Sequence, residues 1–277
     1  MAEPAARVTL ARVAGAFLRR ELAVMASYRL FVIFKLLAVV VTVAMVAFMA
    51  SFVHAGGSLP PARYGAAGYL GFWLLGICVA DLFQTAISAL AQHIRAAQLE
   101  GTLEAMLATP APTAWIVLSA PLTAILFALL RVAVYLGSGL CFGASLGQAD
   151  VVAFLVTLAA ALVAFAALGL LGGALTMTLR RTDPITGLVS VAALLLGGVL
   201  FPVDILPPVL RVLAFALPLG PALEGLRRAL FAGAPLSALG VELGTLAAFT
   251  LVVAPAAAWL FARALRRARA DGSLGHY

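Results

Sequence analysis

The sequence predicts an all-α integral membrane protein with six transmembrane helices. Apolar residues (Ala, Val, Ile, Leu, Met, Phe, Trp, Tyr and Cys) make up 64% of its 277 residues, whereas about half is usual in soluble domains. Charged residues are only 10%, and apolar runs repeatedly reach the roughly 20 residues that cross a bilayer. A soluble domain of this size cannot bury so much apolar surface. A soluble enzyme, a disordered chain and a secreted disulfide scaffold are therefore excluded.

Six apolar runs are candidate membrane spans. They are about Leu30–Val53, Gly65–Leu90, Trp115–Leu146, Val151–Leu179, Ile185–Phe201 and Val241–Phe261. The third is longer than one bilayer requires, so we expect it to tilt or to begin as helix in the cytoplasm. The fifth is short and ends before Pro202, because proline breaks a helix.

The arginines favour one side of this topology. Twelve basic residues fall on one set of loops and four on the other, while Lys35 and Arg131 lie within spans. Because cytoplasmic loops carry the excess of Lys and Arg, both termini are predicted in the cytoplasm. The net charge of +7 is then orienting loop charge and not a nucleic-acid patch. The larger set is Arg7, Arg12, Arg19, Arg20, Arg29, Arg95, Arg180, Arg181, Arg263, Arg266, Arg267 and Arg269.

The N-terminal segment, residues 1–29, contains an amphipathic stripe over about 4–28. A basic amphipathic helix before a span usually lies flat on the inner leaflet, and the alternative is a solvated basic arm. Residues 30–262 form the predicted membrane domain, and 263–277 form a basic cytoplasmic tail. The stripe consists of Leu10, Val13, Phe17 and Val24, with Arg12 and Arg19 opposite.

The loop between spans two and three predicts a short cytoplasmic helix at about 96–109. Its apolar side chains follow helical spacing, and Pro110 ends it. Glu100 and Glu104 repel each other one turn apart, which favours a partner that supplies positive charge. A solvated connector is the alternative. The apolar face is Leu99, Leu103, Met106 and Leu107.

A second unusual segment, about 202–236, lies between spans five and six. Its apolar stretches, Val209–Leu217 and Leu219–Ala232, are too short to span, which is typical of re-entrant or interfacial helices. We expect two short helices dipping back from the outer face and acting as an outer gate, with Glu224 and Arg227 able to pair. The prolines that delimit them are Pro202, Pro207, Pro208 and Pro218.

Charged residues lie within predicted spans, among them Lys35, Asp81 and Arg131. Lys35 is near a span end, where its ammonium is expected to snorkel to the headgroups. Asp81 and Arg131 lie deeper in spans two and three, and intramembrane charges point to pairing or function. The sequence leaves three possibilities open for them: a structural pair, a role in a polar cavity, or neither.

Catalytic chemistry is not expected in this chain. A P-loop needs a lysine after glycine, but Lys35, which follows Phe34, is the only lysine in the sequence. Two cysteines, Cys78 and Cys141, sit in apolar runs and are expected to be small hydrophobes. The histidines are too scattered for a metal set. They are His54, His93 and His276.

At two places the sequence resembles the ABC-2 type transporter permeases. The cytoplasmic motif is Leu99-Glu100-Gly101-Thr102-Leu103-Glu104-Ala105-Met106-Leu107-Ala108-Thr109-Pro110. The outer motif runs from Gly197 to Pro208 and continues through Leu217-Pro218-Leu219 and Ala222–Arg227. The six spans and the order of features are also similar.

The resemblance implies the membrane half of an ABC exporter in the cell (inner) membrane. Two copies would assemble with two copies of a separate ATPase, which would bind ATP and Mg. Residues 99–108 would be the coupling helix, about 4–28 the interface helix, and the outer segment a pair of re-entrant helices. The substrate would be a drug, lipid or glycolipid-linked polysaccharide.

Two other classes compete with this interpretation. An ion-coupled secondary transporter or channel usually needs a coupling carboxylate or broken helices at mid-membrane, and Asp81 is the one candidate. A membrane-embedded enzyme would need a reactive cluster, which the sequence lacks.

Overall fold

The computed structural model describes residues 10–55, 68–101, 113–144, 149–179 and 184–270. All regular elements in these ranges are helices, which confirms the all-α prediction. Five helical stretches are long and apolar enough to cross a membrane, and a bent pair, α9 and α10, would make six. The five are Arg29–Phe52, Gly68–Leu99, Trp115–Cys141, Val151–Met177 and Leu236–Arg267.

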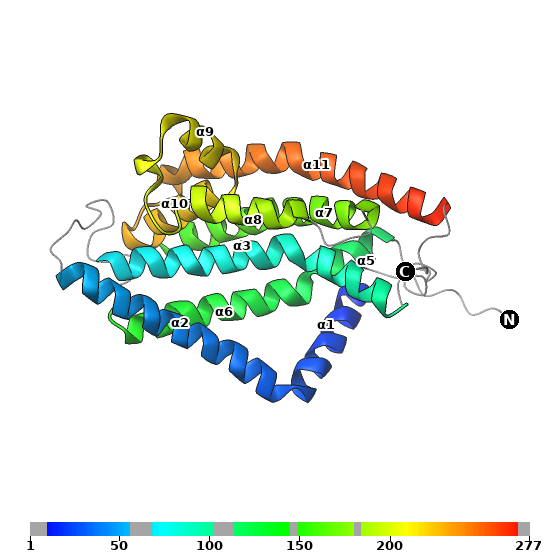
Figure 1. Ribbon diagram of the computed structural model, residues 1–277, viewed down its shortest axis with the longest axis horizontal. Coiled ribbons are helices and arrows are strands. Elements are labelled where there is room, and N and C mark those ends of the chain that lie inside the picture. The colour runs from blue at the N-terminus through cyan, green and yellow to red at the C-terminus, as the bar shows by residue number, and fades with distance from the viewer. Residues whose placement is uncertain (1–9, 56–67, 102–112, 145–148, 180–183, 271–277) are drawn as a thin grey trace.

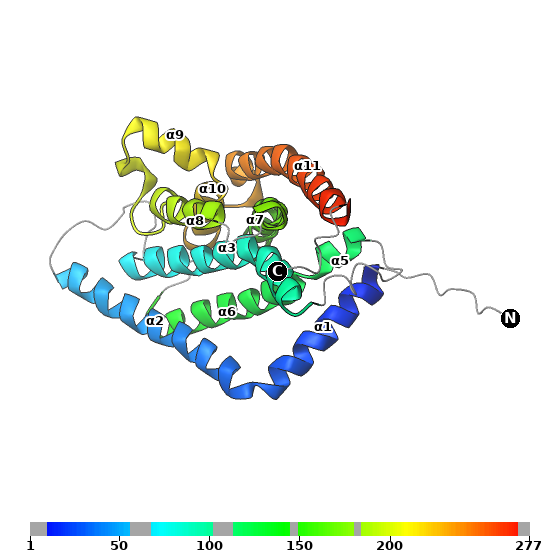
Figure 2. The ribbon, with the colours of Figure 1, turned by 45° about the vertical axis from the view of Figure 1, so that its right-hand side comes forward.

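The chain begins with a helical arm that meets the first span at an elbow. Helix α1 (Leu10–Ser27) ends just before Tyr28, and α2 (Arg29–Ala55) follows. The two form a V whose first limb packs on α5 and α6, as Figures 1 and 2 show. Phe17 on α1 contacts the ring of His93 edge-on, while Arg19 and Arg20 are exposed. The predicted amphipathic helix before the first span is therefore present.

Helix α3 (Gly68–Leu99) is longer than predicted. Its apolar face continues past Leu90 through Ile94, which packs with Leu90 in a cluster that also contains Phe261. The expected end at Leu90 is therefore wrong, and residues 96–99, assigned to the cytoplasmic helix, form the last turn of α3. Gly101, with φ +68°, is the second residue after the helix end.

The long third apolar run is two helices. Helix α5 (Thr113–Ser119) is followed by α6 (Leu122–Cys141), with the break at Ala120–Pro121. Proline cannot donate a backbone hydrogen bond and crowds the preceding turn. The helix ends at Cys141 and not at the predicted Leu146.

Helix α7 (Val151–Leu179) lies at the centre, against α3, α10 and α11. Asp150 begins it, accepting a hydrogen bond from the Ala153 N–H at 2.9 Å. A Cβ on Gly169 would collide with the carbonyl oxygen of Ala86 on α3. The small residue therefore allows close approach of these two helices.

Helix α8 (Pro184–Leu196) corresponds to the predicted fifth span but has only 13 residues. At 1.5 Å per residue it measures about 20 Å, less than the roughly 30 Å hydrocarbon core. The predicted end at Phe201 is wrong, because the chain turns at Gly198, whose φ is +77°.

The expected pair of short helices between spans five and six is present. After the 3-10 turn η2 (Val203–Ile205) come α9 (Pro208–Ala216) and α10 (Leu219–Phe231), which are bent by 83°. Most of α10 is buried, whereas α9 is largely exposed.

The last span extends into the predicted tail. After η3 (Leu236–Leu239), helix α11 (Gly240–Ala270) passes the predicted end at Phe261. Residues 263–270, expected to be tail, therefore continue this helix. The start of α1 and the end of α11 lie at one end of the molecule, and α9 and α10 lie at the other (Figure 1).

Candidate functional site

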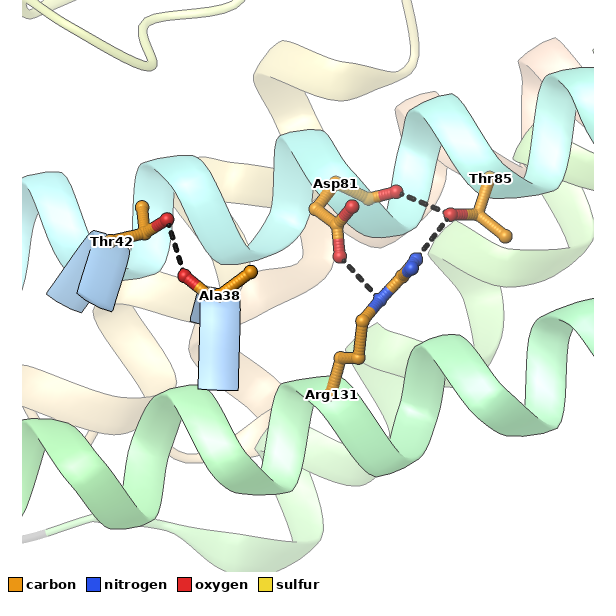
Figure 3. Close-up of polar contacts among 5 residues, drawn as sticks. All are labelled: Ala38, Thr42, Asp81, Thr85 and Arg131. Atoms are coloured by element: carbon orange, nitrogen blue, oxygen red, sulfur yellow. Dashed lines mark hydrogen bonds and ion pairs between the residues drawn. The ribbon is translucent and has the colours of Figure 1, made fainter. Parts of the chain in front are cut away.

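An ion pair joins α3 and α6 inside the helical bundle. Arg131 Nε lies 2.9 Å from Asp81 Oδ2, and Arg131 Nη2 donates to Thr85 Oγ1 at 2.6 Å. The Thr85 hydroxyl in turn donates to the carbonyl oxygen of Asp81 at 2.8 Å. Figure 3 shows the three side chains converging between the two helices. Of the three possibilities that the sequence left open, the pair is the one observed.

The pair is only partly enclosed within this chain. The Arg131 and Asp81 side chains are 15% and 31% exposed. A single charge in hydrocarbon is strongly unfavourable. Asp81 and Arg131 are therefore tolerated there because each balances the charge of the other. Thr85, which the sequence analysis missed, follows Asp81 by four residues and so lies on the same helix face.

A lysine lies beside this centre. Lys35 Nζ is 4.4 Å from the ring centroid of Phe31 and 5.7 Å from that of Phe127. The Arg131 guanidinium approaches the same Phe127 ring at 5.5 Å. Phe127 thus contacts both cations by cation–π geometry. Snorkelling of Lys35 stays a prediction.

At the opposite end from the α1 arm, Arg227 holds the outer segment to the bundle. It is 2% exposed, and it donates to the carbonyl oxygens of Gly198 at 2.9 Å and Phe72 at 2.8 Å. Its guanidinium lies 3.5 Å from the centroid of the Phe72 ring. Arg227 therefore joins α10, the start of α3 and the turn after α8.

Two further features of α3 secure that turn. Trp73 Nε1 donates to the carbonyl oxygen of Leu200 at 2.8 Å. Gly76 lies so close to the turn that a Cβ there would be 2.5 Å from the carbonyl oxygen of Val199. The sequence signal for the Arg227 contacts is a charged residue in a short helix with many apolar residues, but the sequence suggested only Glu224 as its partner.

The remaining residues of the expected outer gate occupy different places. Pro207 and Pro208 begin α9, and Pro218 lies at its bend with α10. Pro202 and Glu224 line a cavity beneath α9. Their gating role stays a prediction.

A second ion pair, not foreseen, joins α10 to α11. Arg228 Nη1 contacts Glu242 Oε1, and Arg228 Nη2 donates to the carbonyl oxygen of Ala238 at 3.0 Å. Glu242 lies in the first turn of α11, within an otherwise apolar predicted span. An isolated acidic residue in an apolar span was the sequence signal that could have revealed this ion pair.

The expected ATPase-coupling residues lie only partly in the described chain. Leu99 ends α3 and is 67% exposed, and Glu100 and Gly101 form an exposed turn. The other five lie outside the described residues. They are Thr102, Leu103, Glu104, Met106 and Leu107.

Metal and disulfide chemistry finds no support in the described ranges. No group of three or more His, Cys, Asp or Glu side chains there is placed to hold a metal ion. Cys78 is buried and Cys141 exposed, and both are free thiols.

The fold defines a multi-pass α-helical membrane protein. Residues 98–231 match the family model of the ABC-2 type transporter, so this part of the chain is an ABC-2 type transporter domain and the resemblance is confirmed. The match runs from the end of α3 through α10, which includes Arg131 and Arg227. No curated protein matches the chain. This match suggests a membrane subunit of an ABC transporter, and domains of this family are generally not catalytic themselves.

Proposed function

We propose that this chain is the permease subunit of an ATP-driven exporter. It moves a hydrophobic or amphiphilic substrate, such as a drug, lipid or glycolipid-linked polysaccharide, out of the cytoplasm or inner leaflet. The observation that carries the proposal is the family match over residues 98–231. The apolar helical fold is consistent with it.

The proposed assembly is a permease homodimer with two ATPase subunits, which bind ATP and Mg. Residues 99–108 dock on the ATPase. Support comes from α3, which runs without a break from the outer turn held by Trp73 to the exposed Leu99. A rigid helix of this kind can carry a displacement from the ATPase to the outer segment.

The proposed location is the cell (inner) membrane with both termini in the cytoplasm. The start of α1 and the end of α11 share one end of the molecule (Figure 1). Arg12 near the start of α1 and Arg263, Arg266 and Arg267 near the end of α11 belong to the larger set of arginines, which the positive-inside rule assigns to the cytoplasm.

Ion-coupled transport is less well supported. A coupling carboxylate must exchange protons or ions during the cycle, whereas Asp81 is held by Arg131. This pairing favours a structural role for the carboxylate.

Reconstitution tests the proposal directly. The permease and its ATPase are placed in proteoliposomes, and ATP is added outside, where the outward-facing ATPase subunits hydrolyse it. Uptake of a labelled lipid or drug into the vesicle lumen is then the equivalent of export. Uptake driven by ATP supports the proposal, whereas uptake driven by an ion gradient without ATP would refute it.

A further inference from the structure

An apolar groove of about 130 Å³ lies between the arm α1 and helix α6. Helix α6 faces the opening of the V that α1 and α2 form (Figure 2). Leu22 on α1 and Leu126 on α6 are 56% and 48% exposed, so the groove is open at the surface of this chain. Across the groove, Leu18, Leu22 and Met25 of α1 face Leu126, Phe127 and Leu130 of α6.

Lys35 of α2 lies at the side of this groove. Its Nζ is 5.7 Å from the ring centroid of Phe127, which lines the groove, and 4.4 Å from that of Phe31. Among the side chains that the structure describes, no carboxylate forms an ion pair with this ammonium, since Asp81 is held by Arg131. A charge among apolar helices is unfavourable without a partner, and aromatic faces stabilise a cation only modestly. Lys35 therefore calls for an anion.

The helices around the groove carry an excess of positive charge. In the sequences of α1, α2 and α6, six basic residues stand against one acidic residue, Glu21. Of the six, Arg131 is balanced by Asp81 of α3, while Arg19, Arg20 and Arg29 are exposed. An apolar groove with a positive rim is complementary to an amphiphile that carries a negative charge.

The position of Lys35 along α2 fits a phospholipid phosphate. Lys35 follows Arg29, the first residue of α2, by six residues, which is about 9 Å along a helix. The headgroup layer of a bilayer is about 5–7 Å thick on each side. With α1 on the inner leaflet, Lys35 is thus near the boundary between headgroups and hydrocarbon, and its flexible stem lets the ammonium reach a phosphate.

We propose that this groove binds an acyl chain of an anionic phospholipid of the inner leaflet, whose phosphate pairs with Lys35. The exposed arginines of the rim favour a headgroup with a net negative charge and repel the choline cation of a zwitterionic lipid. The site depends on Lys35 and the groove, and not on ATP-driven export. Its failure would therefore leave the proposed function untouched.

Two other occupants fit less well. A second copy of this chain that docked here through the same helices would bring one excess of basic residues against another, which is repulsive. A polar peptide would lose its hydrogen bonds to water, because Thr123 is the only polar residue of the groove lining, and unpaired polar groups are unfavourable in an apolar site. A lipid chain with an anionic headgroup matches both the lining and the rim.

The test is native mass spectrometry of the full-length protein in detergent micelles, titrated with single lipids. The probes are phosphatidylglycerol and phosphatidylcholine with identical acyl chains, so that only the headgroup differs. The first phosphatidylglycerol should bind about fivefold or more tightly, because a basic residue close to an anionic lipid contributes roughly that factor. Equal affinities for the two lipids would overturn the proposal.

Lys35→Gln tests the headgroup contact. Lys35 is exposed on α2, so the variant should fold, and it should lose most of the preference for phosphatidylglycerol. The matched control is Arg263→Gln, which removes an exposed cation that also lies over an aromatic ring, 5.6 Å from the centroid of Trp259 on α11. The control should keep the preference. An equal loss in both variants would show that diffuse surface charge attracts the lipid, and would overturn the site.

Leu126→Trp tests the groove independently of the charge. The larger side chain fills space between α1 and α6, so phosphatidylglycerol should bind about fivefold more weakly while the melting temperature is maintained. Unchanged affinity in the folded variant would show that the acyl chain does not lie in this groove. If the variant instead separates a dimer into monomers and binds the lipid normally, the groove is an interface between two copies, and the proposal is wrong.

Discussion

Asp81 and Arg131 show how a charged residue is tolerated among apolar helices. The two side chains come from different helices and meet at 2.9 Å, with Thr85 completing the contact. The ion pair has no net charge, and the attraction between its partners offsets part of the penalty for placing ions in hydrocarbon. The pair thus links α3 to α6.

Removing one partner of this pair should be worse than removing both. We expect Asp81→Asn to lower the free energy of unfolding by about 3 kcal/mol, because Arg131 is left uncompensated. The double variant Asp81→Asn with Arg131→Gln should recover most of the loss. Unfolding in mixed micelles measures both. The account is contradicted if the double variant loses as much free energy of unfolding as the two single variants lose together.

Arg227 should contribute strongly to the stability of the outer segment. Arg227→Leu removes the donors for two carbonyl oxygens, those of Phe72 and Gly198. Because each buried unpaired group is worth about 1–3 kcal/mol, we expect about 3 kcal/mol of destabilisation and faster hydrogen exchange at residues 197–203. Arg263→Leu is the control, since Arg263 is exposed on α11. Equal hydrogen exchange in both variants would show that Arg227 does not hold the turn.

Single residues were predictable only in part from the sequence. Asp81 and Arg131 stood out because charges are rare in spans, but which group they contact depends on the packing of α3 against α6. Arg227 and Glu242 were harder, because their partners are a backbone carbonyl or a residue from another element. Such contacts leave no local pattern in a sequence.

The bent pair of helices α9 and α10 depends on prolines at its start and at its bend. Pro208 occupies a first-turn position of α9, where proline suits a helix. Pro218 lies at the 83° bend. The prolines thus set the geometry of a segment that is exposed on one side and buried on the other.

Replacing Pro207 and Pro208 by Ala should impair export while assembly with the ATPase stays intact. Without the two prolines the entry to α9 loses its fixed backbone angles, whereas the cytoplasmic surface is unchanged. Transport in proteoliposomes and co-purification measure the two effects. The gating assignment is wrong if assembly is lost while the folded permease persists.

The sequence predicted which helices exist better than it predicted where each helix ends. Pro202, Pro207, Pro208 and Pro218 correctly delimited the two short helices. The ends of α3 and α8 were missed, because Ile94 extends an apolar face beyond the hydrophobic run and Gly198 ends a helix inside one. Hydrophobicity reports which segments avoid water, and the backbone conformation of a glycine decides where a helix stops.

Thiol labelling can test the orientation of the protein in the membrane. In a background without Cys78 and Cys141, single cysteines at Ser58 and Ser237 should react with an impermeant thiol reagent added outside sealed cells. Cysteines at Thr102 and Thr182 should not react, because the positive-inside rule places them in the cytoplasm. Labelling of the second pair would overturn the topology.

Fold class and family could be predicted because they depend on composition and on two local motifs. The composition indicated a membrane protein, and the motif at Leu99–Pro110 and that at Gly197–Pro208 indicated an ABC-2 permease. The cavity under α9 could not be predicted, since it is made by four elements whose relative placement no local pattern encodes. Which residues far apart in the sequence line the same cavity becomes visible only once the helices are packed together.

The central claim is mechanical coupling between this chain and an ATPase, and Glu104→Lys tests it most directly. Glu104 lies outside the described residues, and the sequence predicts it within the coupling helix, whereas Glu100 lies in the turn that follows α3. A reversed charge there should leave membrane insertion untouched and weaken ATPase binding or uncouple hydrolysis from export. Glu100→Lys is the matched comparison and should have the smaller effect.

The decisive measurement is substrate transported per ATP hydrolysed by the reconstituted complex. We predict a clear fall in this ratio, or loss of ATPase co-purification, for Glu104→Lys. Normal assembly, normal hydrolysis and normal transport in that variant would show that residues 99–108 are only a connector, and would contradict the proposed coupling.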